Sequence, residues 1–255
     1  MKRALEIIAP IVFVAVLLGL WQGLCVWLAV PSYFLPPPWD IAVALVENAP
    51  TLFVSAGRTL TTALSAFVIV VVLGNLAAVA AASGRIIEAS FRPIAVVLQV
   101  TPIIALAPIF TVWAGIENPE RAVIALACVA AFFPVYSGAL AGLTSSDPEL
   151  ERLFDLYGAT GWQRMTRLKA PSAVPQALEG YKVGLGLSLV GAVIGEMMAS
   201  AGGEEGLAWR ILEASHRMET AKSFAAVAAL ALLAGFLHLG FRFVERRALA
   251  WWRGR

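Results

Sequence analysis

The sequence is poor in charge, cysteine and histidine. Asp, Glu, Lys and Arg make up 14% of its 255 residues, the net charge is +2, and there are two cysteines and two histidines. The low charge, without a basic patch interleaved with aromatic residues, argues against nucleic-acid binding. Cys25 and Cys128 lie inside apolar runs, and His216 and His238 are isolated. Neither a disulfide framework nor a metal site is therefore predicted.

Long apolar runs take the place of these groups. Hydrophobic residues make up 60% of the chain, and several runs exceed the length of an ordinary core helix. The runs are continuous rather than alternating, which argues against a β-barrel. We expect an all-α integral membrane protein with a single domain over residues 1–255. Six stretches can cross a hydrocarbon core of about 30 Å as helices, namely 5–30, 52–82, 93–114, 121–143, 178–200 and 222–244.

Lysine and arginine are distributed unevenly between the two sides of these spans. With the N-terminus inside, most of them fall on the cytoplasmic side, including the pairs Lys2-Arg3 and Arg246-Arg247. The positive-inside rule therefore predicts that both termini are cytoplasmic. The first apolar run continues to about Val30, longer than the core of a signal peptide, so we predict an uncleaved span. On the outer side, the prolines before Trp39 predict a short helix to Val46.

The longest polar stretch between apolar runs joins the fourth and fifth spans. Its residues 146–171, called the hairpin below, predict two short helices. Ser146 and Glu149 have the spacing of a capping box, and Pro148 suits the first turn of a helix. The first helix is expected to end at Tyr157, because Gly158 can adopt the left-handed conformation of a helix end.

The second hairpin helix begins with another capping pair, Thr160 and Gln163. We expect Pro171 and Pro175 to stop it before the fifth span. An apolar edge is predicted from the three-residue spacing of Trp162, Met165 and Leu168, flanked by the cations Arg164, Arg167 and Lys169. A helix of this kind suits either a groove in a soluble partner or lipid phosphates at the inner surface.

The hairpin also resembles a loop of ATP-binding-cassette (ABC) transporter permeases. Gly158, Leu168 and Pro171 have the spacing of that loop, which contains a glycine and ends Ile-x-Leu-Pro. Arg152-Leu153-Phe154 stand where the loop opens Glu-Ala-Ala, and Ala170 replaces the closing Leu. The branch for nitrate, taurine, aliphatic sulfonates and vitamin precursors is similar to further stretches of this chain, namely 34–38, 101–108, 113–115, 145–150 and 158–163. The resemblance covers nearly the whole chain.

The resemblance implies a type I ABC importer permease fold with a core of five helices over about 52–245. It also implies a homodimer in the bacterial inner membrane, two cytoplasmic ATPases, and a periplasmic or lipid-anchored solute-binding protein. ATP and Mg²⁺ would bind the ATPases, because this chain has no phosphate-binding Gly-x-x-x-x-Gly-Lys-Ser/Thr loop. No cofactor and no catalytic activity are expected in the chain itself. Candidate ATPase-coupling residues are Arg152, Asp155, Gly158, Ala159, Thr160, Trp162, Arg164, Leu168 and Pro171.

Candidates for the translocation pathway lie in the fifth and third spans. Gly184, Ser188 and Glu196 share one helix face with Ala192, which indicates a dimer seam, a pathway, or packing within one subunit. An acid at the depth of Glu196 favours a pathway role, although a structural pair with an outer arginine is equally consistent.

In the third span we expect breaks at Pro102 and Pro108. Gln99 and Thr101 are therefore candidates to line a cavity, or else to hydrogen-bond a neighbouring helix.

The leading hypothesis is the membrane subunit of an ABC importer. A secondary transporter or channel working alone is the alternative, although the sequence has no convincing internal repeat and few intramembrane charges. Gln99 to Pro102 and Ala105 to Pro108 resemble permeases for pyrimidine or flavin vitamin precursors more than those for sulfonates, taurine or nitrate.

Overall fold

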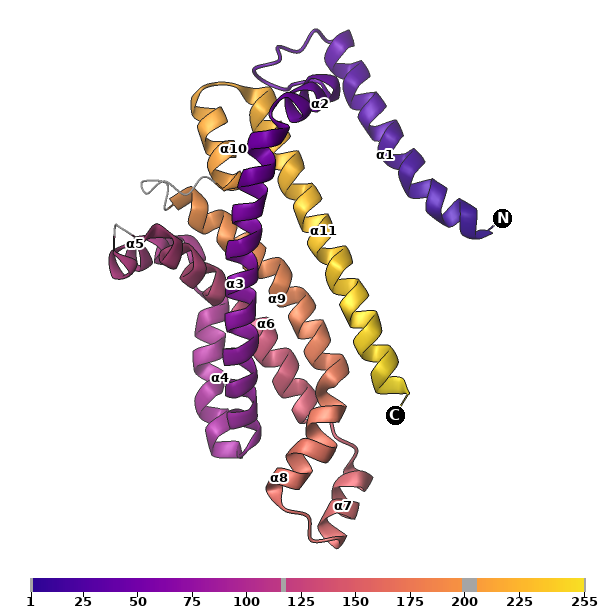
Figure 1. Cartoon of the computed structure of the whole chain (residues 1–255), viewed down its shortest axis with the longest axis vertical. Coiled ribbons are helices and arrows are strands. Elements are labelled where there is room, and N and C mark those ends of the chain that lie inside the picture. The colour runs from indigo at the N-terminus through magenta and orange to yellow at the C-terminus, as the bar shows by residue number, and fades with distance from the viewer. Residues whose placement is uncertain (1, 116–117, 199–205, 255) are drawn as a thin grey trace. The chain divides into compact units, whose positions relative to one another are not determined.

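The computed structural model describes residues 2–115, 118–198 and 206–254. In these ranges the chain forms helices joined by short turns and contains no β-strand, which confirms the all-α prediction (Figure 1). In chain order the elements are α1 (Lys2–Trp27), α2 (Pro38–Glu47), α3 (Ala49–Ala82), α4 (Arg85–Val100), α5 (Ile103–Ala114), α6 (Pro119–Leu143), α7 (Pro148–Leu156), α8 (Gly161–Arg164), the π-helical turn η1 (Met165–Lys169), α9 (Ala170–Met198), α10 (Leu207–His216) and α11 (Thr220–Arg253).

Within the described residues, five helical stretches are long and apolar enough to cross a membrane. A sixth crossing results if the bent pair α4 and α5 counts as one span. The predicted spans therefore correspond to helices of the structure, apart from the last residues of the fifth, 199 and 200, which lie outside the described ranges. The five stretches are Ile8–Trp27, Ala49–Ala82, Pro119–Leu143, Gly161–Met198 and Thr220–Trp252.

The third predicted span is not one straight helix. Helices α4 and α5 meet at an angle of 100°. Thr101 is extended, as is usual for the residue before a proline, and Pro102 has no N–H with which to continue the α4 hydrogen bonds. The second predicted break, at Pro108, is wrong, because α5 runs through it. A proline inside a membrane helix removes one hydrogen bond without having to end the helix.

The chain divides into two compact units. The first comprises Met1–Gly57 and Glu205–Leu232, and the second comprises Arg58–Glu204 and Leu233–Arg255. In the first unit, α2 begins with Pro38 in its first turn, so the predicted outer helix is confirmed. Helix α10 was not expected from the sequence, because it is short and charged rather than apolar.

Helices α6 and α9 form the centre of the second unit. The two helices approach closely because glycines of α9 face the backbone of α6. A Cβ atom at Gly180 would lie 2.5 Å from the carbonyl oxygen of Pro134, and one at Gly191 would lie 2.6 Å from the Cα of Ala127. Small residues let membrane helices gain van der Waals contact along their backbones. The aromatic rings of Phe91 and Phe132 stack on Tyr136 in the same unit.

Candidate functional site

The first helix of the hairpin, α7, has a different cap from the one predicted. Asp147 is the N-cap, and its carboxylate accepts a 2.8 Å hydrogen bond from the Glu149 N–H. Ser146 instead donates through its hydroxyl to the Glu151 carboxylate at 2.7 Å. The predicted Ser146–Glu149 capping box is therefore wrong, because the residue nearest to the helix start carries the better acceptor. The prediction of Pro148 in the first turn is confirmed.

The turn between α7 and α8 agrees with the sequence analysis. Gly158 follows the end of α7 with a φ of 61°, in the left-handed region that glycine adopts without strain. Thr160 caps α8, with its hydroxyl accepting from the Gln163 N–H at 3.3 Å. The Gln163 side chain accepts from the Thr160 N–H at 2.9 Å, which completes the capping box.

The second hairpin helix does not stop at Pro171 or Pro175, so that prediction is wrong. Helix α8 passes through η1 directly into α9. At the end of η1 the Ala170 N–H bonds to the Met165 carbonyl, five residues back. This wider turn replaces the ordinary helical bond just before Pro171, whose missing N–H is then tolerated in the first turn of α9.

Ion pairs join the two arms of the hairpin. The Arg164 guanidinium pairs with Glu151 at 3.3 Å and with Asp155, both on α7. The Lys169 ammonium lies 4.0 Å from Glu151. These two cations therefore interact with the hairpin itself, whereas Arg152 and Arg167 are exposed.

The predicted apolar edge is divided between the core and the surface. Leu168 is buried, and Met165 packs against the cluster that contains Tyr136 and Ala173. Trp162 remains 76% exposed. Around the turn, Leu156 is 85% and Tyr157 is 82% exposed. These three large side chains, Leu156, Tyr157 and Trp162, are called the hairpin tip below; Ala159 and Thr160 lie between them in sequence.

The pathway candidates on α9 are all buried, and Gly184 packs against α6. A Cβ atom at Gly184 would be 2.5 Å from the Val135 Cγ2 atom. Ser188 is buried and donates to the Leu185 carbonyl at 2.8 Å. Glu196, on the same face, is also buried, with 7% of its surface exposed. The Gly184 contact is one of helix packing within one subunit, an alternative that the sequence left open. A pathway role for the three residues stays a prediction.

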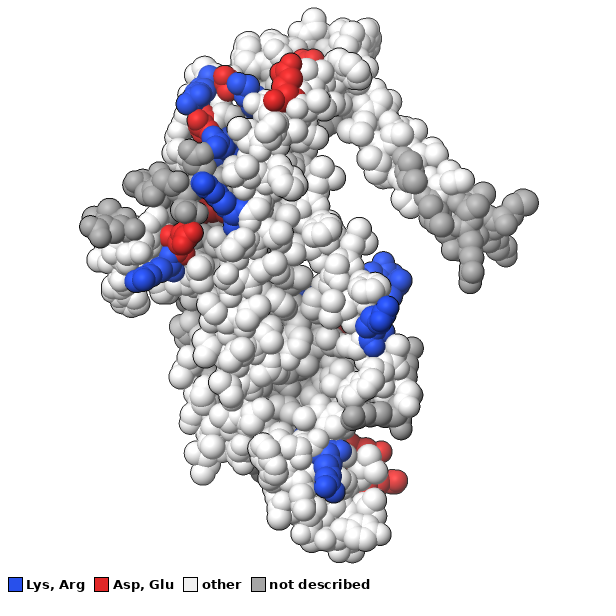
Figure 2. Space-filling model, in the orientation of Figure 1, with Lys and Arg blue, Asp and Glu red and all other residues white. Residues whose placement is uncertain are grey.

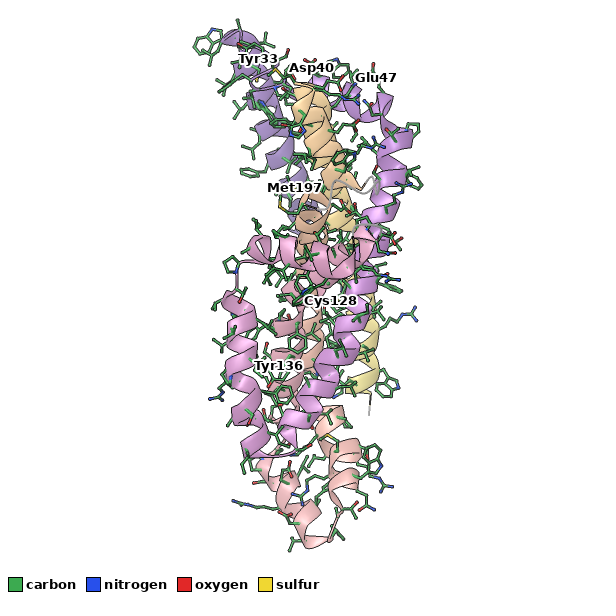
Figure 3. All side chains as sticks on the ribbon, turned by 90° about the vertical axis from the view of Figure 1, so that its left-hand side faces the viewer. Tyr33, Asp40, Glu47, Cys128, Tyr136 and Met197 are labelled. Atoms are coloured by element: carbon green, nitrogen blue, oxygen red, sulfur yellow. The ribbon has the colours of Figure 1, made fainter. Side chains whose placement is uncertain are left out.

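Gln99 and Thr101 line a cavity, one of the two alternatives that the sequence left open, and their role in the translocation pathway stays a prediction. The cavity has a volume of about 330 Å³ and lies within the second unit, where α4, α5, α6 and α9 meet. Phe133 and Ser137 of α6 and Leu187 of α9 also line it. In Figure 3 the labels of Cys128 and Tyr136 mark α6, the helix that also carries Phe133 and Ser137.

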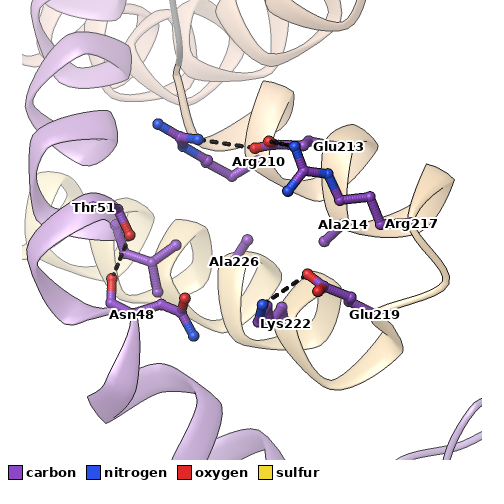
Figure 4. Close-up of a pocket in the computed structure, with 10 residues that line it drawn as sticks. Asn48, Thr51, Arg210, Glu213, Ala214, Arg217, Glu219, Lys222 and Ala226 are labelled. Atoms are coloured by element: carbon purple, nitrogen blue, oxygen red, sulfur yellow. Dashed lines mark hydrogen bonds and ion pairs between the residues drawn. The ribbon is translucent and has the colours of Figure 1, made fainter.

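A charged pocket in the first unit was not foreseen. Arg210 and Arg217 both bind Glu213, at 2.8 and 2.9 Å, and Lys222 binds Glu219 at 2.8 Å (Figure 4). The pocket has a volume of about 170 Å³. Acidic and basic side chains lie side by side around α10 and the turn that follows it (Figure 2). The three- and four-residue spacing of Arg210, Glu213 and Arg217 was a usable signal, because it places them on one side of α10.

Residues 71–249 match the protein family described as binding-protein-dependent transport system inner membrane component. The chain belongs to this family. It is the membrane permease of an ABC importer rather than a transporter working alone. The match includes the hairpin, the cavity at the α4–α5 bend and most of α11.

Curated relatives extend the similarity over almost the entire permease. The formylaminopyrimidine transport permease protein ThiX of Halalkalibacterium halodurans is 29% identical over 98% of both chains. The taurine transport system permease protein TauC of Escherichia coli is 28% identical over 93% of this chain and 87% of its own. The riboflavin transport system permease protein RibX of Chloroflexus aurantiacus is 28% identical over 92% and 87%, respectively.

Proposed function

We propose that the hairpin is the part of the permease that binds the ATPase and transmits its motion. The observation that carries this proposal is the exposed hairpin tip. Three large side chains, two of them aromatic, are exposed on a turn whose arms are joined by ion pairs and caps. Aromatic side chains provide much of the binding energy of protein interfaces, and a rigid turn loses little conformational entropy on binding.

The hairpin then lies on the cytoplasmic side, with both termini. Two copies of the permease enclose the pathway and sit on two ATPases, which bind ATP and Mg²⁺. The permease itself is non-catalytic and holds no cofactor. A periplasmic or lipid-anchored binding protein delivers the solute outside. Closure of the ATPases favours one arrangement of the helices and binding-protein docking the other, so that access alternates between the two sides.

The solute is a small organic molecule, and we favour a vitamin precursor of the pyrimidine or flavin type. Two of the relatives are named for formylaminopyrimidine and riboflavin transport, and the match to the first of these covers 98% of the permease. Taurine, sulfonates and nitrate form the second choice, since other relatives are named for taurine and aliphatic sulfonates.

Co-purification of the permease with its ATPase tests the role of the hairpin tip. Tyr157→Asp places a charge in the tip and should reduce the ATPase recovered with the permease at least tenfold. Tyr33→Asp is the matched control, because Tyr33 is another exposed tyrosine but lies outside the hairpin. If the ATPase is recovered equally with both variants, the hairpin tip is not the docking element. Loss of the ATPase with Tyr33→Asp alone would place the docking surface elsewhere.

A further inference from the structure

The cavity at the α4–α5 bend has the size and position of a small-molecule site. Its volume of about 330 Å³ falls within the range of roughly 300–1,000 Å³ that ligand pockets occupy. The 100° bend between α4 and α5 lies beside the cavity, because Gln99, Thr101 and Ile103 line it. Interrupted helices at membrane depth are tolerated where their freed backbone groups line a cavity, and transporters bind solutes at such breaks.

Two prolines free backbone acceptors in the cavity wall. Leu98 lies four residues before Pro102, and Ala130 lies four residues before Pro134. Proline has no N–H, so neither the Leu98 nor the Ala130 carbonyl has its usual helical donor. Both Leu98 and Ala130 line the cavity. Two separate helices therefore each contribute to the wall a residue whose carbonyl lacks its helical donor.

The polar side chains of the wall add further acceptors. The Thr101 hydroxyl donates to the Val97 carbonyl at 2.6 Å, and the Ser137 hydroxyl donates to the Pro134 carbonyl at 3.3 Å. Each hydroxyl has one hydrogen, so its oxygen is left to accept from a ligand. The Gln99 amide offers both a donor and an acceptor. Among the polar groups of this mainly apolar wall, acceptors therefore outnumber donors.

The cavity has no group that would neutralise an anion. Among the described residues that line it there is no Lys, Arg or His, and no Asp or Glu. A sulfonate would lose its hydration and meet mainly oxygen lone pairs, which is unfavourable in an apolar surrounding. An uncharged heterocycle with N–H groups would instead donate to those oxygens. The Phe133 ring adds an aromatic surface for stacking.

We propose that this cavity binds the transported solute and selects an uncharged, planar heterocycle that carries N–H donors. The inference rests on the proposed function, and it names the solute class and the residues that recognise it. Selection then occurs twice, first by the binding protein and again inside the permease. Sulfonates and other anions without N–H donors are disfavoured at the second step even if the binding protein releases them there.

The proposal is tested by ligand binding to the permease–ATPase complex in lipid nanodiscs without the binding protein, and by uptake into proteoliposomes with the binding protein added. The probes are a formylaminopyrimidine and riboflavin as uncharged heterocycles, and ethanesulfonate as the anion. We expect uptake in proteoliposomes and saturable binding for at least one heterocycle and neither for ethanesulfonate. Ethanesulfonate binding as tightly as the heterocycles, or no heterocycle binding at all, would overturn the proposal.

Variants then locate the site. Gln99→Leu and Thr101→Val each remove hydrogen-bonding atoms from the wall and should raise the KM for heterocycle uptake roughly 3- to 10-fold, with a smaller change in kcat. The matched control is Thr111→Val, because Thr111 also donates to a carbonyl of its own helix, that of Ala107, but is not part of the cavity wall. Its KM should equal that of the unchanged permease.

One further measurement separates this proposal from the proposed function. Recovery of the ATPase with each variant reports on the hairpin and is independent of the cavity. If the ATPase is recovered and ATP drives uptake, but Gln99→Leu and Thr101→Val leave KM unchanged, the cavity is not the recognition site. If the ATPase is not recovered with the unchanged permease, the proposed coupling role fails, while ligand binding still decides the cavity.

Discussion

The indole Nε1 of Trp252 donates a 2.7 Å hydrogen bond to the carbonyl oxygen of Pro171. Four residues after Pro171 comes Pro175, which has no N–H to offer that carbonyl. The last turns of α11 therefore supply the donor that α9 lacks at its own beginning. Since α9 continues directly from the hairpin, this bond also ties the C-terminal helix to the base of the hairpin.

Trp252→Phe should destabilise the permease, because it leaves the Pro171 carbonyl unpaired while keeping most of the aromatic contact. An unpaired buried acceptor costs about 1–3 kcal/mol, and the partly buried position favours the lower end. Thermal unfolding in detergent measures the change. Trp39→Phe, at an exposed indole, is the control. Equal unfolding temperatures for the two variants would show that the bond to Pro171 contributes nothing to stability.

Arg164→Gln should weaken the hairpin, because Arg164 pairs with both Glu151 and Asp155. We expect ATP-driven uptake by the assembled importer to fall severalfold, while surface ion pairs of this kind add little to global stability. Arg167→Gln removes an equal charge from an exposed position and should have the smaller effect. The reverse order would mean that these cations act on lipid or on a partner rather than on the hairpin.

Gly158→Ala should loosen the same turn. The φ of 61° at Gly158 costs an alanine roughly 1–2 kcal/mol. Local opening of the hairpin then becomes about 5-fold more frequent or greater, and trypsin cleavage within residues 146–171 should accelerate accordingly. Gly161→Ala is the control, because that glycine has an ordinary φ and open space around it. Similar cleavage rates for both would contradict the strain argument.

Gly180→Ala and Gly186→Ala, in the same helix, should change stability in opposite directions. A methyl group at Gly180 meets the Pro134 backbone at 2.5 Å, where no side chain can move aside, whereas Gly186 has nothing within 4 Å. Overpacking costs about 1–3 kcal/mol, while alanine in a free helical position gains up to about 1 kcal/mol over glycine. Thermal unfolding in detergent measures the stability of both variants. Equal tolerance of both would show that α6 and α9 can separate without cost.

The sequence was most informative where the signal is local. Apolar length predicted the helices, and the φ preference of Gly158 and the Thr160–Gln163 pair predicted the turn of the hairpin. It was least informative where neighbours decide. Pro102 and Pro108 look alike in the sequence, yet only Pro102 ends a helix. Which proline bends the chain depends on packing that no local pattern contains.

The candidate site shows the same limit. The spacing of Trp162, Met165 and Leu168 predicted a single apolar edge, but the structure buries Leu168 and leaves Trp162 exposed. The cavity residues Gln99 and Thr101 were found because prolines nearby signalled an interrupted helix. Ser137 was missed, since a lone serine in an apolar run is more often bonded to its own helix, as it also is here.

Lys182 provides a last test, because it has one buried and one exposed partner. Its ammonium lies 3.6 Å from Glu245 of α11, whose side chain is 12% exposed, and 3.4 Å from Glu179, whose side chain is 65% exposed. Burial strengthens an ion pair by lowering the local dielectric, whereas an exposed pair three residues apart adds only about 0.2–0.5 kcal/mol.

Double-mutant cycles separate the two contacts. We expect a coupling energy of about 1–3 kcal/mol between Lys182→Met and Glu245→Gln, and less than about 0.5 kcal/mol between Lys182→Met and Glu179→Gln. Thermal unfolding in detergent provides all the free energies. Comparable coupling in the two cycles would mean that water or lipid headgroups screen Glu245 as well. The ion pair would then not hold the end of α11 against α9, and Trp252 would be left as the main polar link between them.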